Sequence, residues 1–219
     1  MGVLIGSVGS AAMTEKTSRA TGDVVAVLAV QGAFVKHERR LEELGARCIE
    51  LRQANDLERP FDRLVLPGGE STAQAKMLHE LGMFAALRAR IAAGMPTLAT
   101  CAGLILLAER LEDDPTVHFS TLPIAVRRNA YGRQLGSFHA QGTLVADVVD
   151  VYADGSYASS IPLTFIRAPR ITALHTSVLP LVTLDNGEVV AVRYKNQIAC
   201  AFHPELDPDP RIHELFLHL

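Results

Sequence analysis

Three residues in two short segments carry side chains that are able to act together as a nucleophile, a base and an orienting carboxylate. Cys101 follows a short apolar run, and His203 and Glu205 lie two residues apart near the C-terminal end. A histidine that faces a thiol, with a carboxylate to orient it, forms the base and orienting group of a cysteine nucleophile. The sequence therefore predicts a catalytic triad of Cys101, His203 and Glu205.

The surroundings of Cys101 are typical of a nucleophile elbow, where a reactive side chain projects from a tight strand-to-helix turn. Small neighbours (Ala99, Ala102 and Gly103) allow the close backbone approach that such a turn requires. A helix that begins just after Cys101 would also favour the thiolate. A buried cysteine that merely ends a strand is the alternative interpretation.

The tripeptide His203-Pro204-Glu205 strengthens the first interpretation. A residue before proline is pushed toward the extended region, and residues two apart in an extended segment point the same way. We therefore expect His203 and Glu205 to lie side by side. Alone, the tripeptide also fits a solvated loop, but the order Cys, His, Glu, with each member at a predicted strand end, is more specific.

A glycine pair, Gly68-Gly69, follows another predicted strand and precedes Glu70. It is either a plain turn or a place where backbone N–H groups approach an anion closely. In the second case it forms an oxyanion hole with the N–H of Ala102. The Gly-x4-Gly-Lys pattern of a phosphate loop is absent.

Arginines and cysteines elsewhere allow fewer conclusions. Arg127, Arg128 and Arg167 are either surface charges or, beside the site, a clamp for a substrate carboxylate. Cys48 and Cys200 lie in apolar, strand-like runs and are expected to be buried. The sequence shows no Cys-x-x-Cys pair and no ligand cluster, so we expect neither a metal nor another cofactor.

A parallel sheet is needed to bring these segments together. Apolar runs alternate with helical patterns in the first half of the chain, which predicts a doubly wound, mostly parallel sheet with helices on both faces. Ligands collect at the carboxyl ends of such strands. The predicted strands are 24–30, 48–51, 63–66 and 97–100, and the predicted helices are 34–44, 71–90 and 104–111.

The second half predicts mainly strands and therefore an antiparallel extension. Asp185-Asn186-Gly187 is a hairpin signal between two of them. We expect one domain over residues 23–219, preceded by a flexible extension, residues 1–22, in which Met13 is an alternative start. The predicted strands are 143–152, 163–166, 177–184, 189–194 and 198–202.

Composition narrows the functional classes. Of the 219 residues, 48% are hydrophobic and 21% charged, as in ordinary globular proteins. A net charge of −3 and the absence of Trp argue against nucleic-acid binding. The uncharged stretch 91–108 is interrupted by Gly94 and Pro96, so no membrane span is expected. Without a basic leader or a disulfide framework, we expect a cytoplasmic protein.

Six motifs resemble one family, the glutaminase subunits of two-component pyridoxal 5′-phosphate synthases (the PdxT/SNO family), within the class I glutamine amidotransferases. The resemblance extends from about residue 24 to residue 206. The sequences QGAF, RNAYGRQ and FIRAP, within the first, fourth and fifth of these motifs, distinguish this vitamin B6 branch. The motifs are AVLAVQGAF (26–34), LVLPGGEST (64–72), ATCAGLILLA (99–108), RRNAYGRQ (127–134), FIRAP (165–169) and AFHPEL (201–206).

The resemblance implies a three-layer α/β/α, flavodoxin-like fold of the class I glutamine amidotransferase type and a role for each matching residue. Cys101 would be the nucleophile, His203 the general base and acid, and Glu205 its orienting carboxylate. L-Glutamine would be hydrolysed, and the ammonia passed to a separate synthase subunit that makes pyridoxal phosphate. The implied substrate-binding residues are Gly68, Gly69, Glu70, Arg128, Ile166 and Arg167, and the implied oxyanion-hole residues are Gly69, Ala102, Gln31 and Gly32.

One position departs from the family pattern. Ala99 replaces the first glycine of the usual Gly-Thr-Cys-Ala-Gly elbow. The alanine is tolerated if the backbone there has ordinary strand dihedrals, and otherwise it displaces Cys101. Two rival hypotheses remain, a stand-alone cysteine hydrolase acting on another amide or a peptide, and a catalytically dead scaffold that only binds the synthase.

Overall fold

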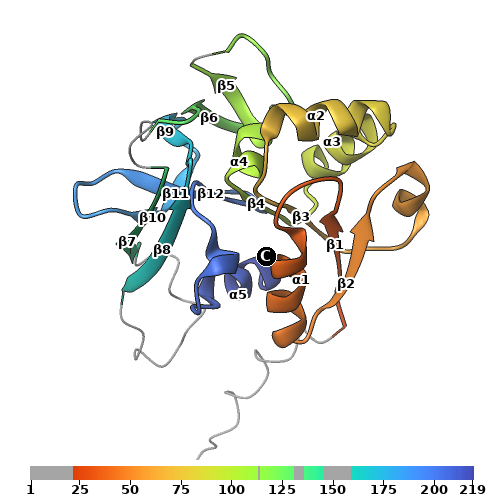
Figure 1. Ribbon diagram of the computed structural model, residues 1–219, viewed down its shortest axis with the longest axis horizontal. Helices are drawn as coiled ribbons and strands as arrows, with labels where there is room; N and C mark the ends of the chain where they lie inside the picture. Colours follow the sequence, from red (N-terminus) through yellow and green to blue (C-terminus); the bar gives the residue numbers. More distant parts are fainter. Residues whose placement is uncertain (1–21, 113, 131–135, 146–158) are drawn as a thin grey trace, which may run out of the picture.

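A single large sheet forms the centre of the molecule (Figure 1). The computed structural model describes residues 22–112, 114–130, 136–145 and 159–219. Five adjacent strands of the sheet are parallel to one another, so their carboxyl ends share one edge. In spatial order they are β2 (Arg47–Leu51), β1 (Val24–Leu28), β3 (Arg63–Leu66), β4 (Thr97–Thr100) and β12 (Gln197–Cys200).

Four antiparallel strands continue the sheet beyond β12. The predicted hairpin is confirmed: Gly187 has a positive φ of 80° and closes the turn between the third and fourth strands predicted in this half. In spatial order the antiparallel strands are β11 (Val189–Tyr194), β10 (Leu179–Thr183), β7 (Ser137–Leu144) and β8 (Ser160–Ile166).

Helices cover both faces of the parallel strands, which confirms the predicted three layers (Figure 1). The alternation of buried side chains along β1 shows why both faces must be covered. Ala26 and Leu28 pack on one face and Val25 and Val27 on the other, because successive side chains of a strand point to opposite sides. One face carries α1 (Phe34–Glu43) and α5 (Arg211–Leu217), and the other carries α2 (Ser71–Glu80), α3 (Phe84–Ala92) and α4 (Ala102–Leu107).

Two predicted helices were wrong in extent. The helix predicted over 71–90 is divided into α2 and α3, because Gly82, with φ of 69°, ends the first of them. The helix predicted over 104–111 ends at Leu107. The chain then forms β5 (Ala108–Leu111), which joins β6 (Leu122–Arg127) and β9 (Arg170–Leu174) in a second sheet. Pairing partners so distant in sequence leave no local signal.

Other predictions depend on residues that the structure does not describe. The extension 1–22, apart from Gly22, and the alternative start Met13 lie outside the described residues, as do 146–152 of the strand predicted over 143–152. The described part of that strand belongs to β7, which begins six residues earlier than predicted. Among the described helices, none is long and apolar enough to cross a membrane.

Ala99 lies within β4, where its neighbours are Leu66 of β3 and Ala199 of β12. Its backbone is not among the described positive-φ residues, so its Cβ costs no strain. Gly103, on the other side of Cys101, differs: a Cβ there would overlap the carbonyl oxygen of Leu66. The elbow therefore requires glycine at 103 and accepts alanine at 99.

This contrast yields a paired stability prediction. Ala99→Gly should lower the free energy of unfolding by only about 1 kcal/mol, since a buried methyl group is lost and a strand residue gains backbone freedom. Gly103→Ala should cost more, about 2–3 kcal/mol, because backbone must move to relieve the overlap. Urea unfolding measures both. A larger loss for Ala99→Gly would contradict the assignment of strain to Gly103.

Candidate active site

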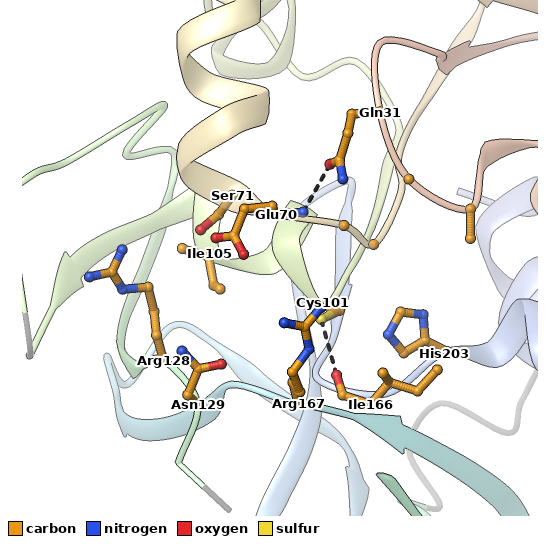
Figure 2. A pocket seen from close by; sticks show the side chains of 14 residues that line it. Gln31, Glu70, Ser71, Cys101, Ile105, Arg128, Asn129, Ile166, Arg167 and His203 are labelled. Atoms are coloured by element: carbon orange, nitrogen blue, oxygen red, sulfur yellow. Dashed lines mark hydrogen bonds between the residues drawn. The ribbon is translucent and has the colours of Figure 1, made fainter. Parts of the chain in front are cut away.

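Four turns meet at the carboxyl edge of the parallel strands (Figure 2). They follow β1, β3, β4 and β12, which are consecutive neighbours in the sheet. The turns enclose a cavity of about 200 Å³. That volume is below the ~300–1,000 Å³ usual for drug-sized ligands and suits a small metabolite.

Cys101 occupies the turn between β4 and α4. Its φ of 48° and ψ of −98° are unusual for a residue with a side chain, and its N–H donates to the carbonyl of Cys200 at 2.8 Å. Backbone strain of this kind persists only where the surrounding structure enforces it. Asn129 and Arg167, at φ of 47° and 43°, line the same cavity, so strained residues gather here. The predicted elbow at Cys101 is present.

His203 and Glu205 are brought together as expected, although by a different local structure. Nδ1 of His203 lies 2.7 Å from Oε1 of Glu205, and both residues are buried. Pro204 begins a short 3-10 helix, η3 (Pro204–Leu206), so Glu205 is in a helical turn rather than in the predicted extended segment. Proline is well suited to the first position of a helix, which accounts for the difference.

The backbone of Gly68 packs against both Cys101 and His203. A Cβ at this glycine would overlap the ring of His203 and lie 3.4 Å from Cβ of Cys101. The backbone of the glycine turn therefore fills the space beside both side chains. Nε2 of His203 is buried and has no hydrogen-bonding partner among the described residues. The thiol of Cys101 lies 3.9 Å from the carbonyl oxygen of Ile166, an interaction drawn in Figure 2.

The electrostatics favour an ion pair between a protonated His203 and an ionised Glu205, next to the Cys101 thiol. Burial lowers the pKa of His203, but interactions with Cys101 and with the Glu205 carboxylate outweigh it and raise the pKa to about 10. Burial raises the pKa of Glu205, yet the neighbouring His37 and His203 lower it overall. His203 is therefore able to hold a proton at neutral pH while Glu205 remains ionised.

The turn after β1 is clamped to the glycine turn. Oε1 of Gln31 accepts the N–H of Glu70 at 2.9 Å, and the N–H of Ala33 donates to the Gly68 carbonyl at 3.3 Å. Gly32 has φ of 101°, and a Cβ there would overlap the Gly68 carbonyl oxygen. These contacts place Gln31 and Gly32 beside Gly69, as the resemblance implied for an oxyanion hole.

All six residues implied for substrate binding line the cavity. Arg128 lies on the side of the cavity away from His203, and Arg167 lies close to Cys101 (Figure 2). Arg128 forms an ion pair of 2.9 Å with Asp114. Ala102 and Glu205 are not in the lining: Ala102 begins α4, and Glu205 is behind His203. The lining residues from the implied set are Gln31, Gly32, Gly68, Gly69, Glu70, Cys101, Arg128, Ile166, Arg167 and His203.

Several supporting residues had no signal in the sequence. Gln74, fully buried on α2, donates from Nε2 to the carbonyls of Gln31 and Pro67 at 3.1 and 3.2 Å and so ties the two turns together. Asp207 accepts hydrogen bonds from the N–H and hydroxyl of Thr164, which attaches the loop after η3 to β8. Each is a polar residue among apolar neighbours, a pattern that alone does not identify a partner.

Comparison with known proteins identifies the family. Residues 27–219 match the SNO glutamine amidotransferase family. The chain belongs to this family. A pyridoxal 5′-phosphate synthase subunit PdxT from Desulfitobacterium hafniense is 53% identical over 88% of the chain and 91% of the relative. The PdxT subunit of Bifidobacterium longum is 49% identical over 88% and 98%, respectively.

A solved structure supports the same family assignment. A crystal structure described as a glutamine amidotransferase superposes with a TM-score of 0.77 at 36% sequence identity. The match covers 89% of this chain and 97% of that one. The predicted class I glutamine amidotransferase fold is thus confirmed, together with the predicted family.

The raised pKa of His203 predicts a pH dependence of stability. The folded-state pKa of about 10 exceeds the ordinary value of 6.5, so the stabilisation is complete below about pH 6.5 and is lost toward pH 10. A difference of one bound proton between the folded and unfolded states changes the free energy of unfolding by up to about 1.4 kcal/mol per pH unit. The free energy of unfolding of the parent should therefore fall more steeply over this range than that of His203→Gln, measured by urea unfolding.

The exposed His218 provides the control. His218→Gln should keep the parental slope between pH 6.5 and 10, because His218 lies away from the cavity lining. Equal slopes for the parent and His203→Gln would show that the His203 proton does not stabilise the fold.

Proposed function

We propose that this protein is the glutaminase subunit of a pyridoxal 5′-phosphate synthase and that it hydrolyses L-glutamine to L-glutamate and ammonia. The observation that carries the proposal is the buried His203–Glu205 pair, packed through Gly68 against Cys101 at the edge of a small cavity. The PdxT names of the relatives supply the biosynthetic context. The catalytic domain would comprise residues 23–219, in accord with β1 beginning at Val24.

The first half of the proposed reaction forms a thioester. The Cys101 thiolate attacks the side-chain amide carbon of glutamine, and backbone N–H groups at Gly69 and Ala102 stabilise the oxyanion. The His203 imidazolium gives its proton to the departing nitrogen, so ammonia leaves and a glutamyl thioester remains. The raised pKa of His203 suits this acid step, because the proton is retained until the leaving group requires it.

The second half regenerates the Cys101 thiolate and the His203 imidazolium. Neutral His203 takes a proton from water, the resulting hydroxide attacks the thioester carbonyl, the C–S bond breaks with Cys101 leaving as thiolate, and glutamate is released. Glu205 holds the imidazole through Nδ1 and stabilises its positive charge. No step requires a metal or an organic cofactor.

Recognition of the amino-acid part of glutamine is assigned to the opposite side of the cavity. Arg128 would bind the α-carboxylate through its guanidinium group, in exchange for its ion pair with Asp114. Gly68, Gly69, Glu70, Ile166 and Arg167 would complete the pocket. This proposal favours glutamine over a peptide, because a peptide bond would remove the free carboxylate.

Transfer of ammonia to a synthase partner completes the proposed role. In water, ammonia is protonated and loses its nucleophilicity, so direct passage between subunits preserves its reactivity. We also propose a cytoplasmic location, since Cys48, Cys101 and Cys200 are all free thiols.

Replacement of the nucleophile tests the chemistry. Cys101→Ala should abolish glutamate release, because no other thiol faces His203, while binding of the synthase subunit remains intact. Cys48→Ala is the matched control and should retain parental activity, since Cys48 is on β2 and outside the cavity lining. Hydrolysis by Cys101→Ala near the parental rate would show that the nucleophile is wrongly assigned.

The partner assay tests the biological context. Ammonia release from glutamine, measured with and without a pyridoxal 5′-phosphate synthase subunit, should be slow for the isolated chain and stimulated by the partner. Full activity of the isolated chain would contradict the coupled role. Turnover of peptides instead of glutamine would favour a stand-alone hydrolase, and no turnover under either condition would favour a scaffold.

A further inference from the structure

Behind the proposed triad lie two further histidines that the mechanism does not use. His37 on α1 and His213 on α5 are both 0% exposed, and Nδ1 of His37 is 3.0 Å from Nε2 of His213. The other nitrogen of His37, Nε2, is 3.3 Å from Oε2 of Glu205 and 3.2 Å from the hydroxyl of Thr100. A line of polar groups therefore runs from α5 through α1 to the carboxylate of Glu205.

The two oxygens of Glu205 have unequal partners. Oε1 is 2.7 Å from His203, whereas Oε2 is buried and has no hydrogen bond of regular geometry in the described part of the chain. Its polar neighbour there is His37, at the longer distance of 3.3 Å. A buried carboxylate oxygen without any donor would be costly, so the N–H of His37 is important at this position.

The charge of Glu205 determines which nitrogens carry protons. An ionised carboxylate only accepts, so Nε2 of His37 must be the N–H that faces it. Nδ1 of His37 is then an acceptor, and the 3.0 Å contact must be a hydrogen bond donated by Nε2 of His213. Nδ1 of His213 is left as an unprotonated acceptor, consistent with its having no partner among the described residues.

Both histidines are suited to remain neutral in this arrangement. Burial lowers the pKa of His37, and burial and the neighbouring His37 lower that of His213. The surrounding titratable groups are His203 and Glu205 from the η3 loop, Arg40 from α1, and Cys200 at the end of β12. Only Glu205 favours protonation of the pair, and its negative charge is already shared with His203.

We propose that His37, oriented by His213, is a positioning residue that holds Oε2 of Glu205 and thereby keeps the carboxylate ionised and aligned on His203. The proposal extends the triad inward by two residues and builds on the proposed function. Neither histidine touches the cavity, since both lie on the far side of Glu205 from Cys101. Their contacts lead toward the thiol through Glu205 and His203, and also through Thr100, the residue before Cys101.

The expected consequence concerns the chemical step rather than substrate binding. Without the His37 N–H, Glu205 would rotate or take up a proton and would stabilise the His203 imidazolium less well. His37→Leu should therefore lower kcat for glutamine in the complex with the synthase subunit by about tenfold, a size usual for a group one step removed from a reacting residue. KM should stay within about twofold, because the cavity is unchanged.

A second readout is independent of glutamine. The rate of alkylation of Cys101 by iodoacetamide, followed by mass spectrometry between pH 5 and 10, reports its thiolate. In His37→Leu the rate at pH 7 should fall about tenfold, and the midpoint of the profile should move upward. Cys48 is an internal reference, since burial and nearby carboxylates raise its pKa to about 12 away from the triad.

Matched variants separate positioning from loss of stability. His37→Gln retains an N–H donor and should recover part of the activity, and His213→Leu should give a smaller defect than His37→Leu. Gln197→Leu is the stability control, because Gln197 is a buried polar residue whose side chain pairs with Thr121, away from Glu205. It should lower Tm without moving the alkylation midpoint.

The outcomes decide between the alternatives. A parental kcat and alkylation profile in folded His37→Leu, or an equal shift in Gln197→Leu at equal Tm, would overturn the proposal. If His37→Leu does not fold, His37→Gln and His213→Leu provide the same comparison. Absence of glutaminase activity in the parent would refute the proposed function alone, because the alkylation profile would still test the link from His37 to Cys101.

Discussion

The close approach of Gly68 to His203 and Cys101 is the constraint on which the site depends. No side chain fits at residue 68, because even a Cβ would overlap the imidazole. A Cβ at Gly32 would likewise overlap the Gly68 carbonyl oxygen, and a Cβ at Gly103 would overlap the Leu66 carbonyl oxygen. Three turns from different strands are thus pressed into contact, and parallel strand ends are what bring them to one place.

The second constraint is the negative charge of the Glu205 carboxylate in the protein interior. Glu205 is buried, and its ionised form is tolerated because neighbouring nitrogens surround it. On one face of the sheet, α1 supplies one of these nitrogens through His37, which in turn contacts His213 on α5, while the loop after β12 supplies His203. The layer that completes the hydrophobic core therefore also supports the electrostatics of the site.

Much of the fold followed from local patterns. The strands β1, β3, β4, β11 and β12 lie where apolar runs predicted them, since a strand buried on both faces needs an uninterrupted apolar sequence. The helix predicted over 34–44 is α1, which ends at Glu43, and Gly45 follows it with φ of 88°. The second sheet was missed because the residues of β5 directly follow α4 and were predicted as part of the same helix, and because β6 pairs with β9, which lies far along the chain.

The sequence by itself determined the elbow at Cys101, the neighbouring His203 and Glu205, and the family, because each depends on residue types at short, fixed spacings. Only the tertiary structure decided that Gly68 packs against both His203 and Cys101, that Gln74 joins two turns, and that His37 meets Glu205. These contacts join residues from different layers of the fold. Their distances are set by how helices pack on the sheet, which spacing along the chain does not encode.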